Sequence, residues 1–301
     1  MTALQLQVRH ATRYDYAAPV TLAHHLAHLH PLQDAHQQLL QHTLEISPPP
    51  GDLREGRDAH GNACTWFSLD QAHPSLEVVA TSRLEISARF EALQADASPA
   101  WDALAHGLQY VSRSPFDPAV EFALPSPYVP RLPGLRDWAA ASLAPGRPVA
   151  EAALALMAQL HGEFEYASAS TQVDTPLRQA FERRRGVCQD FAHVLIGALR
   201  MHGVPARYVS GYLLTQAATG EPAMVGADAS HAWVQVHAPG TPGVPADGWL
   251  DLDPTNRVVP GAGHVRVAVG RDYGDVAPLR GVIRGGGRHT LGVSVHTRRA
   301  A

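Results

Sequence analysis

The order of hydrophobic and polar residues divides the chain into a β-rich first third and a mixed remainder. Residues 76–86, "LEVVATSRLEI", alternate so that one face holds Leu76, Val78, Ala80, Ser82, Leu84 and Ile86. This period of two predicts a half-buried strand. Residues 40–46 alternate more weakly and stop at "SPPPG". The Gly61-Asn62 pair lies between two extended runs, which favours a hairpin.

Two segments in the middle of the chain have the spacing of amphipathic helices. "RPVAEAALALMAQLHGEFEY" places apolar residues on one face at Val149, Ala152, Leu156, Met157 and Leu160. Pro148 suits its first turn, and Gly162 suits its end. A second helix is predicted to start near Cys188, and its apolar positions are Phe191, Leu195, Ala198 and Leu199. Gly203 and Pro205 would close it.

Beyond residue 205 the pattern returns to strands separated by turns. The segments are "ARYVSGYLL", "HAWVQVHA", "GWLDLDPTN", "HVRVAVG" and "LGVSVHT". Helices followed by strands predict an α+β fold with an antiparallel sheet. We expect two domains, a β-rich domain at residues 1–92 and a core with the C-terminal strands at residues 93–301.

The composition limits the possible classes of function but does not identify one. The chain has 301 residues, of which 45% are hydrophobic and 17% charged, values typical of a soluble globular protein. A net charge of −4 gives no reason to expect a nucleic-acid or membrane partner. No apolar run is long enough to span a bilayer, and the N-terminus does not resemble a signal peptide. Two cysteines do not make a disulfide scaffold, so we predict a cytoplasmic protein.

Cys188 is the first candidate for chemistry. A helix N-terminus presents unpaired N–H groups and the positive end of the helix dipole, so a thiol there loses its proton more easily. The same N–H groups could stabilise an oxyanion. A lone cysteine is more often a small buried hydrophobe, however. Cys188 alone does not decide between these interpretations.

Two later strands supply a base and a carboxylate. Alternation places His231, Trp233, Gln235 and His237 on one face of a strand, and Trp249, Asp251 and Asp253 on one face of the next. If Gln235 lies opposite Trp249 in a hairpin, His231 lies opposite Asp253. A shift of register by two residues would bring in Asp251 instead. A thiol, an imidazole and a carboxylate together form a nucleophile, its base and an orienting group.

These segments resemble the catalytic blocks of the bacterial transglutaminase-like superfamily. The matching stretches are "RRGVCQDFAHVLIGALRMHGVPARYVSGYL", "SHAWVQVHAPG" and "GWLDLDPTN", and the N-terminal and C-terminal regions resemble this family too. The resemblance implies a papain-like core with Cys188 as nucleophile, His231 as base and Asp253 as carboxylate. It implies thiol acyl transfer on a peptide or protein substrate. We also expect Trp233, Gln189 and Tyr166 to contact substrate, and "GRDYGD" (residues 270–275) to pack near the site.

Other functions remain open from the sequence. A metal protein would need "HHLAHLH", with His24, His25, His28 and His30, but Cys64 is distant in sequence and no CxxC or HExxH motif occurs. We therefore expect no metal and no cofactor. A non-catalytic binding module of this fold would be expected to lack part of the triad. Hydrolysis by a cysteine peptidase or amidase is favoured over amine transfer by a transglutaminase, because water needs no acceptor site. The sequence does not indicate the oligomeric state.

Overall fold

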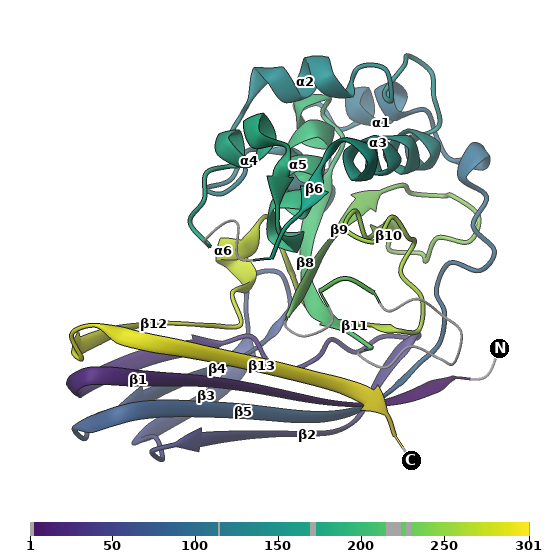
Figure 1. The fold of residues 1–301 in the computed structure, drawn as a ribbon. Coiled ribbons are helices and arrows are strands. Elements are labelled where there is room, and N and C mark those ends of the chain that lie inside the picture. The colour runs from purple at the N-terminus through teal and green to yellow at the C-terminus, as the bar shows by residue number, and fades with distance from the viewer. Residues whose placement is uncertain (1–2, 114, 169–172, 215–223, 227–229, 301) are drawn as a thin grey trace.

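The computed structural model describes residues 3–113, 115–168, 173–214, 224–226 and 230–300. The chain forms two layers, a broad sheet of long strands and, above it, a cluster of helices around a second sheet (Figure 1). This confirms the predicted α+β class with a β-rich N-terminal region. Within the described ranges, no helix is long and apolar enough to cross a bilayer.

The large sheet is organised around β1 (Leu4–Ala27), a strand of 24 residues. Its strands run in the order β2 (Gln37–Ser47), β5 (His73–Ile86), β1, β4 (Ala63–Leu69) and β3 (Asp52–Arg57). The alternation predicted for residues 76–86 is confirmed, because these positions of β5 are alternately buried and partly exposed. The hairpin predicted at Gly61-Asn62 joins β3 to β4, and Gly61 has a φ of +83° there.

The last two strands of the chain join the large sheet. Both β12 (Leu279–Gly285) and β13 (His289–Arg299) pair antiparallel with β1. The sequence placed this segment with the core at residues 93–301, and the structure assigns it to the N-terminal sheet instead. Alternation identifies a strand by the face it buries, and it does not say which sheet supplies its hydrogen-bond partner.

The upper layer contains the remaining elements. Its helices are η1 (Ala95–Ala97), α1 (Trp101–Gly107), η2 (Pro118–Ala123), α2 (Pro133–Ala139), α3 (Val149–Glu163), α4 (Leu177–Arg183), α5 (Cys188–Met201) and α6 (Tyr273–Val276). Its strands are β6 (Glu165–Tyr166), β7 (Arg185–Gly186), β8 (Ala206–Leu213), β9 (His231–His237), β10 (Trp249–Leu252) and β11 (His264–Gly270). The second sheet has the order β10-β9-β8-β11, and all its pairs are antiparallel, as predicted.

Helix α5 lies in the middle of this layer. It packs between the sheet and the helices α2, α3 and α4 (Figure 1). The apolar face of β9, with Ala232, Val234 and Val236, is buried in the same hydrophobic cluster as Leu195 and Leu199 of α5. The sequence predicted both helices correctly, since α3 and α5 begin and end within a few residues of their expected limits. A helix buried this thoroughly gives its N-terminus a fixed position.

The two layers are packed together and hydrogen-bonded. Leu6 and Val8 of the large sheet share a buried cluster with Tyr212, Val265 and Val267 of the second sheet. Beside this cluster, the Gln37 side chain donates to the carbonyl of Arg266 at 2.7 Å and accepts from its N–H at 2.9 Å. The large sheet thus supports the sheet that holds the candidate site.

Candidate active site

Cys188 is the first residue of α5. The Asp190 carboxylate accepts a hydrogen bond from the Val187 N–H at 2.8 Å, which caps the helix one residue before the thiol. A glycine is needed at position 186 for a steric reason, because a Cβ there would lie 2.5 Å from the Asp190 Oδ2 atom. The thiol is partly exposed, whereas Cys64 is buried. The local sequence therefore places a reachable sulfur atom at a capped helix N-terminus.

His231 and Asp253 form a buried ion pair. The His231 Nε2 atom lies 2.9 Å from the Asp253 Oδ2 atom, and both side chains are shielded from solvent. Burial disfavours the imidazolium, but the Asp253 carboxylate and the Cys188 side chain outweigh it and raise the pKa of His231 to about 10. Among the described residues, His231 Nδ1 has no hydrogen-bond partner, while the Cys188 side chain is close enough to contribute to the raised pKa of His231. One imidazole nitrogen is thus held by the carboxylate, and the other is left open.

The hairpin that brings these residues together has a different register from the predicted one. Trp249 lies opposite His237 rather than Gln235, a shift of two residues. The pairing already begins at the turn, where the Ala238 N–H donates to the carbonyl of Gly248, whose φ is +75°. Asp253 lies just beyond β10 in an isolated bridge with Val258. Its side chain therefore meets His231 diagonally, and Asp251 does not replace it.

Three further residues hold the Asp253 carboxylate through four contacts. His264 Nε2 lies 3.2 Å from Oδ2, and Asn256 Nδ2 donates to the same oxygen at 2.8 Å. The backbone N–H groups of Thr255 and Asn256 donate to Oδ1 at 3.0 and 3.2 Å. Burial opposes ionisation, but the two histidines hold the pKa of Asp253 well below its usual range. The sequence reasoning missed His264 and Asn256, although "PTN" follows the aspartate directly.

Asn256 also connects Asp253 to a distant segment. Its Oδ1 atom accepts from the Val225 N–H at 2.8 Å, and its Nδ2 atom lies 3.2 Å from the Val225 carbonyl. The next residue, Gly226, has a φ of +88°, and a Cβ there would lie 2.8 Å from His231 Nδ1. Gly226 therefore lies against the imidazole at Nδ1. No pattern in the sequence indicated this contact.

The three residues expected to contact substrate have different surroundings. Trp233 is fully buried, and the centroid of its ring lies 6.1 Å from that of the His231 ring, on which it stacks. The indole therefore packs against the imidazole and offers no open surface to a substrate. Gln189 adjoins Cys188, and its amide donates to the Val173 carbonyl at 2.9 Å. Tyr166 is half-buried, on a strand that pairs with Gly186. Gln189 and Tyr166 therefore lie beside the Cys188 segment, and Trp233 stacks on His231.

The "GRDYGD" segment contacts α5, the helix that begins at Cys188. The Tyr273 N–H donates to His193 Nε2 of α5 at 3.2 Å, and the Tyr273 ring contacts the Tyr208 ring at 6.4 Å. The Asp272 side chain accepts from the Gly274 N–H and so caps the start of α6, and its other oxygen accepts from the Tyr128 N–H. The segment packs behind α5, and its carboxylates are engaged in structural hydrogen bonds.

The arginines just before Cys188 differ in their surroundings. Arg184 lies with its guanidinium 4.4 Å above the ring of Phe181, and Arg185 lies near Glu165 at the surface. Arg185 is therefore part of a solvated face, whereas Arg184 packs on aromatic rings.

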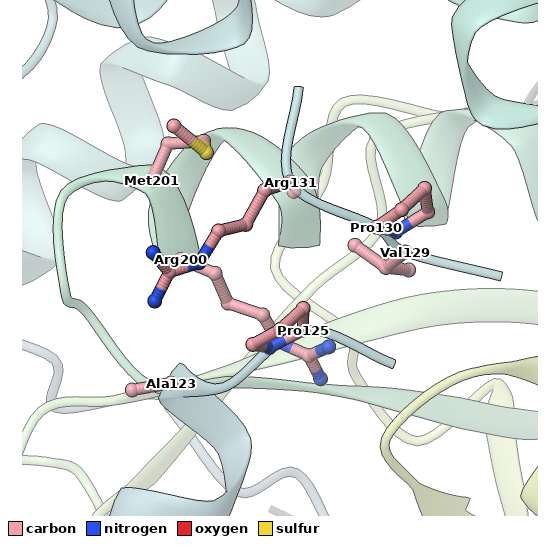
Figure 2. Close-up of a pocket in the computed structure, with 8 residues that line it drawn as sticks. Ala123, Pro125, Val129, Pro130, Arg131, Arg200 and Met201 are labelled. Atoms are coloured by element: carbon pink, nitrogen blue, oxygen red, sulfur yellow. The ribbon is translucent and has the colours of Figure 1, made fainter. Parts of the chain in front are cut away.

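A small pocket lies at the opposite end of α5 (Figure 2). Its lining includes Val129, Arg131, Arg200 and Met201. The Arg200 guanidinium is already bound by the carbonyls of Phe122, Ala206 and Arg271. Arg200 is twelve residues from Cys188 along the helix, or about 18 Å at 1.5 Å per residue. The pocket is thus separate from the triad, and Arg200 joins α5 to its neighbours.

Family models match two parts of the chain. Residues 6–85 match the bacterial transglutaminase-like N-terminal region, and residues 136–254 match the transglutaminase-like superfamily. A protein of Mycobacterium tuberculosis without a described function is 36% identical over 280 residues, which cover 92% of this chain and 87% of the relative.

Two further proteins are similar to this chain. The crystal structure of a candidate cysteine protease from Cytophaga hutchinsonii aligns with a TM-score of 0.73 and 21% identity, and covers all of this chain and 92% of its own. At this identity the likeness shows a common fold. A protein-glutamine gamma-glutamyltransferase of Pseudomonas aeruginosa is 37% identical over 84 residues, which are 27% of this chain and 11% of that protein.

Proposed function

The chain belongs to the transglutaminase-like superfamily, and from its site we propose that it is a thiol-dependent acyl-transfer enzyme that acts on peptide or isopeptide amides. The observation that supports this proposal most is the buried His231–Asp253 pair, whose second imidazole nitrogen is available to Cys188. A non-catalytic binding module would have no need of a buried ionic pair aimed at a thiol, because such a pair is costly to bury.

The first half of the reaction forms a thioester. The Cys188 thiolate attacks the amide carbonyl carbon and forms a C–S bond, and the carbonyl becomes an oxyanion. The free N–H groups at the start of α5 are the proposed donors to this oxyanion. His231, which took the thiol proton, gives it to the amide nitrogen. The C–N bond then breaks, and the amine leaves.

The second half releases the acyl group. A water molecule attacks the thioester while His231 accepts its proton, and the C–S bond breaks to return the thiolate. Asp253 keeps the imidazole oriented and stabilises its cationic form in both halves. We favour hydrolysis, as for a cysteine peptidase or amidase. We also propose a cytoplasmic location, which the two free thiols support.

A second candidate is amine transfer, in which a lysine amine replaces water. The likeness of 84 residues to a protein-glutamine gamma-glutamyltransferase favours it. Both reactions use the same thioester, so the triad does not separate them.

A thiol-directed probe followed by product analysis tests the proposal. The wild-type protein should be labelled once, and Cys188→Ala should lose the label and lower turnover by at least about 10⁴-fold. Wild-type enzyme that has not been treated with the probe is then profiled on a peptide library with and without an added amine. A free carboxylic acid supports hydrolysis, and an amine adduct supports transfer. An unlabelled, folded wild-type protein would refute the catalytic function.

A further inference from the structure

Three side chains of metal-ligand type meet at the junction of the two layers. His28 follows β1, Asp58 begins the turn after β3, and Cys64 lies on β4. One ligand atom from each lies within 4.8 Å of the others. Ala27 pairs with Thr65, so one further step along both strands brings His28 opposite Cys64. The sequence argument against a metal rested on the distance of Cys64 along the chain, and the sheet removes that distance.

The hydrogen bond of His28 determines which nitrogen faces the cluster. Nδ1 lies 3.2 Å from the Ala277 carbonyl, which can only accept, so Nδ1 holds the proton. Nε2 of the neutral ring then presents a lone pair. It lies 3.3 Å from Asp58 Oδ2, is fully buried and satisfies no hydrogen bond among the described residues. Two lone pairs at this distance in a buried site need a cation or a further proton between them.

The surrounding contacts hold each candidate ligand in place. The Asp58 carboxylate accepts from the N–H groups of His60 and Asn62 and from the Asn62 side chain at 2.7 to 2.9 Å. The Asn62 amide is itself bonded to the backbone of Val269 in both directions. The Cys64 thiol donates to the Asn62 carbonyl at 3.4 Å, a hydrogen bond that a metal ion at the sulfur would replace. Such outer contacts are characteristic of metal sites, where they orient the ligands.

The donor set selects the kind of ion. Imidazole nitrogen, carboxylate oxygen and thiolate sulfur together are ligands of Zn²⁺, whereas Ca²⁺ and Mg²⁺ take oxygen. Two ligands about 2.0 Å from a tetrahedral ion lie about 3.3 Å apart, which is the separation of Nε2 and Oδ2. A carboxylate and a thiolate also neutralise the charge of a divalent ion, which suits a buried position.

We propose that His28 Nε2, Asp58 Oδ2 and Cys64 Sγ bind one zinc ion, with water as the fourth ligand. Binding forms the Zn–S bond and releases the Cys64 thiol proton to solvent. The ion would fix the turn after β3, which also contacts the upper layer where His60 meets Asp275 at 3.2 Å. Asp275 is on α6, and α6 contacts α5 through Tyr273 and His193. A zinc ion here would therefore stabilise the turn after β3 and, through α6, the position of α5.

Metal analysis of the full chain, purified without a histidine tag, tests the proposal. The wild-type protein should retain one zinc per chain at micromolar free zinc. Cobalt substitution should produce a thiolate-to-cobalt charge-transfer band. Cys64→Ser should abolish that band, and Asp58→Asn, which keeps the shape of the turn, should weaken zinc binding at least about tenfold.

Matched variants separate this site from the catalytic thiol and from the other histidines. Cys188→Ala and His24→Gln should retain the zinc, and Cys188→Ala should retain the cobalt band. Circular dichroism confirms that each variant is folded. Folded wild-type protein without stoichiometric zinc would overturn the proposal, even if no variant folds. So would zinc that survives Cys64→Ser and is lost in Cys188→Ala.

Discussion

The two thiols of the chain have opposite surroundings. Cys188 is partly exposed at a helix N-terminus, and its neighbour His231 is held as a cation by Asp253. Cys64 is buried in a sheet, where burial and the nearby Asp58 carboxylate raise its pKa to about 11. The first environment places the sulfur beside an imidazole that can accept its proton, and the second keeps the thiol protonated unless an external cation replaces the proton. Position in the fold, rather than residue type, determines the chemistry of each sulfur.

The largest effect is expected when the Asp253 carboxylate is removed from His231, the proposed base for Cys188. Asp253→Ala should lower kcat by about 10³ to 10⁴-fold, because the imidazole loses its orientation and its stabilised charge. Asp251→Ala, two residues earlier on β10, should change kcat by less than about tenfold, since Asp251 lies opposite Gln235 rather than His231. Steady-state kinetics on one peptide substrate measures both. Equal losses in the two variants would contradict the assignment of Asp253.

The reactivity of the two thiols should differ by at least about a hundredfold. A thiol with a pKa near 11 is ionised to about one part in 10⁴ at pH 7, whereas a free thiol is ionised to a few per cent. Iodoacetamide should therefore alkylate Cys188 much faster than Cys64 in the folded, zinc-free protein, and unfolding should remove the difference. Mass spectrometry of tryptic peptides gives both rates. Faster alkylation of Cys64 would reverse the comparison.

A tenfold effect is expected from Asn256→Ala. This variant removes one donor to Asp253 and releases Val225, so it loosens both the carboxylate and the segment beside His231. Loss of such hydrogen bonds costs about 1 to 1.5 kcal/mol, or about tenfold in kcat/KM. The alkylation rate of Cys64 should not change, and it serves as an internal control. An unchanged kcat/KM would show that Asn256 does not position the triad.

The smallest expected effect is on the alkaline limit of activity. The imidazolium of His231 must donate a proton to the leaving amine, and its pKa is raised to about 10 by Asp253 and Cys188. Activity should therefore persist well above pH 7 and fall as His231 loses its proton. Asp253→Asn removes the charge that favours the imidazolium, so the residual activity should fall at a pH lower by at least about one unit. A pH profile of kcat for both proteins tests the sign of this shift.

The core elements of the site could be predicted from local sequence. Helix α5 was recognisable because Phe191, Leu195 and Leu199 recur at helical spacing, and the strands of His231 and Asp253 were recognisable by alternation. The hairpin register was predicted wrongly by two residues, because the turn at Gly248 determines where pairing starts. The role of Asp253 did not depend on that count, since its side chain reaches His231 from beyond the strand.

Contacts between distant segments could not be predicted in this way. The bond from His264 to Asp253 depends on the placement of β11 beside β8, and the Asn256–Val225 contact depends on a loop without periodicity. The pairing of the C-terminal strands with β1 likewise has no local signal.

By itself, the sequence determined the local elements, the helix N-terminus at Cys188 and the faces that bear His231 and Asp253, because these follow from short-range periodicity and steric preference. Only the tertiary structure decided which side chains surround each thiol. His28 approaches Cys64, and His264 approaches Asp253, because of strand pairing and layer packing. Such contacts join residues that are far apart in the chain, and they depend on the shape and hydrogen-bonding groups of the whole fold.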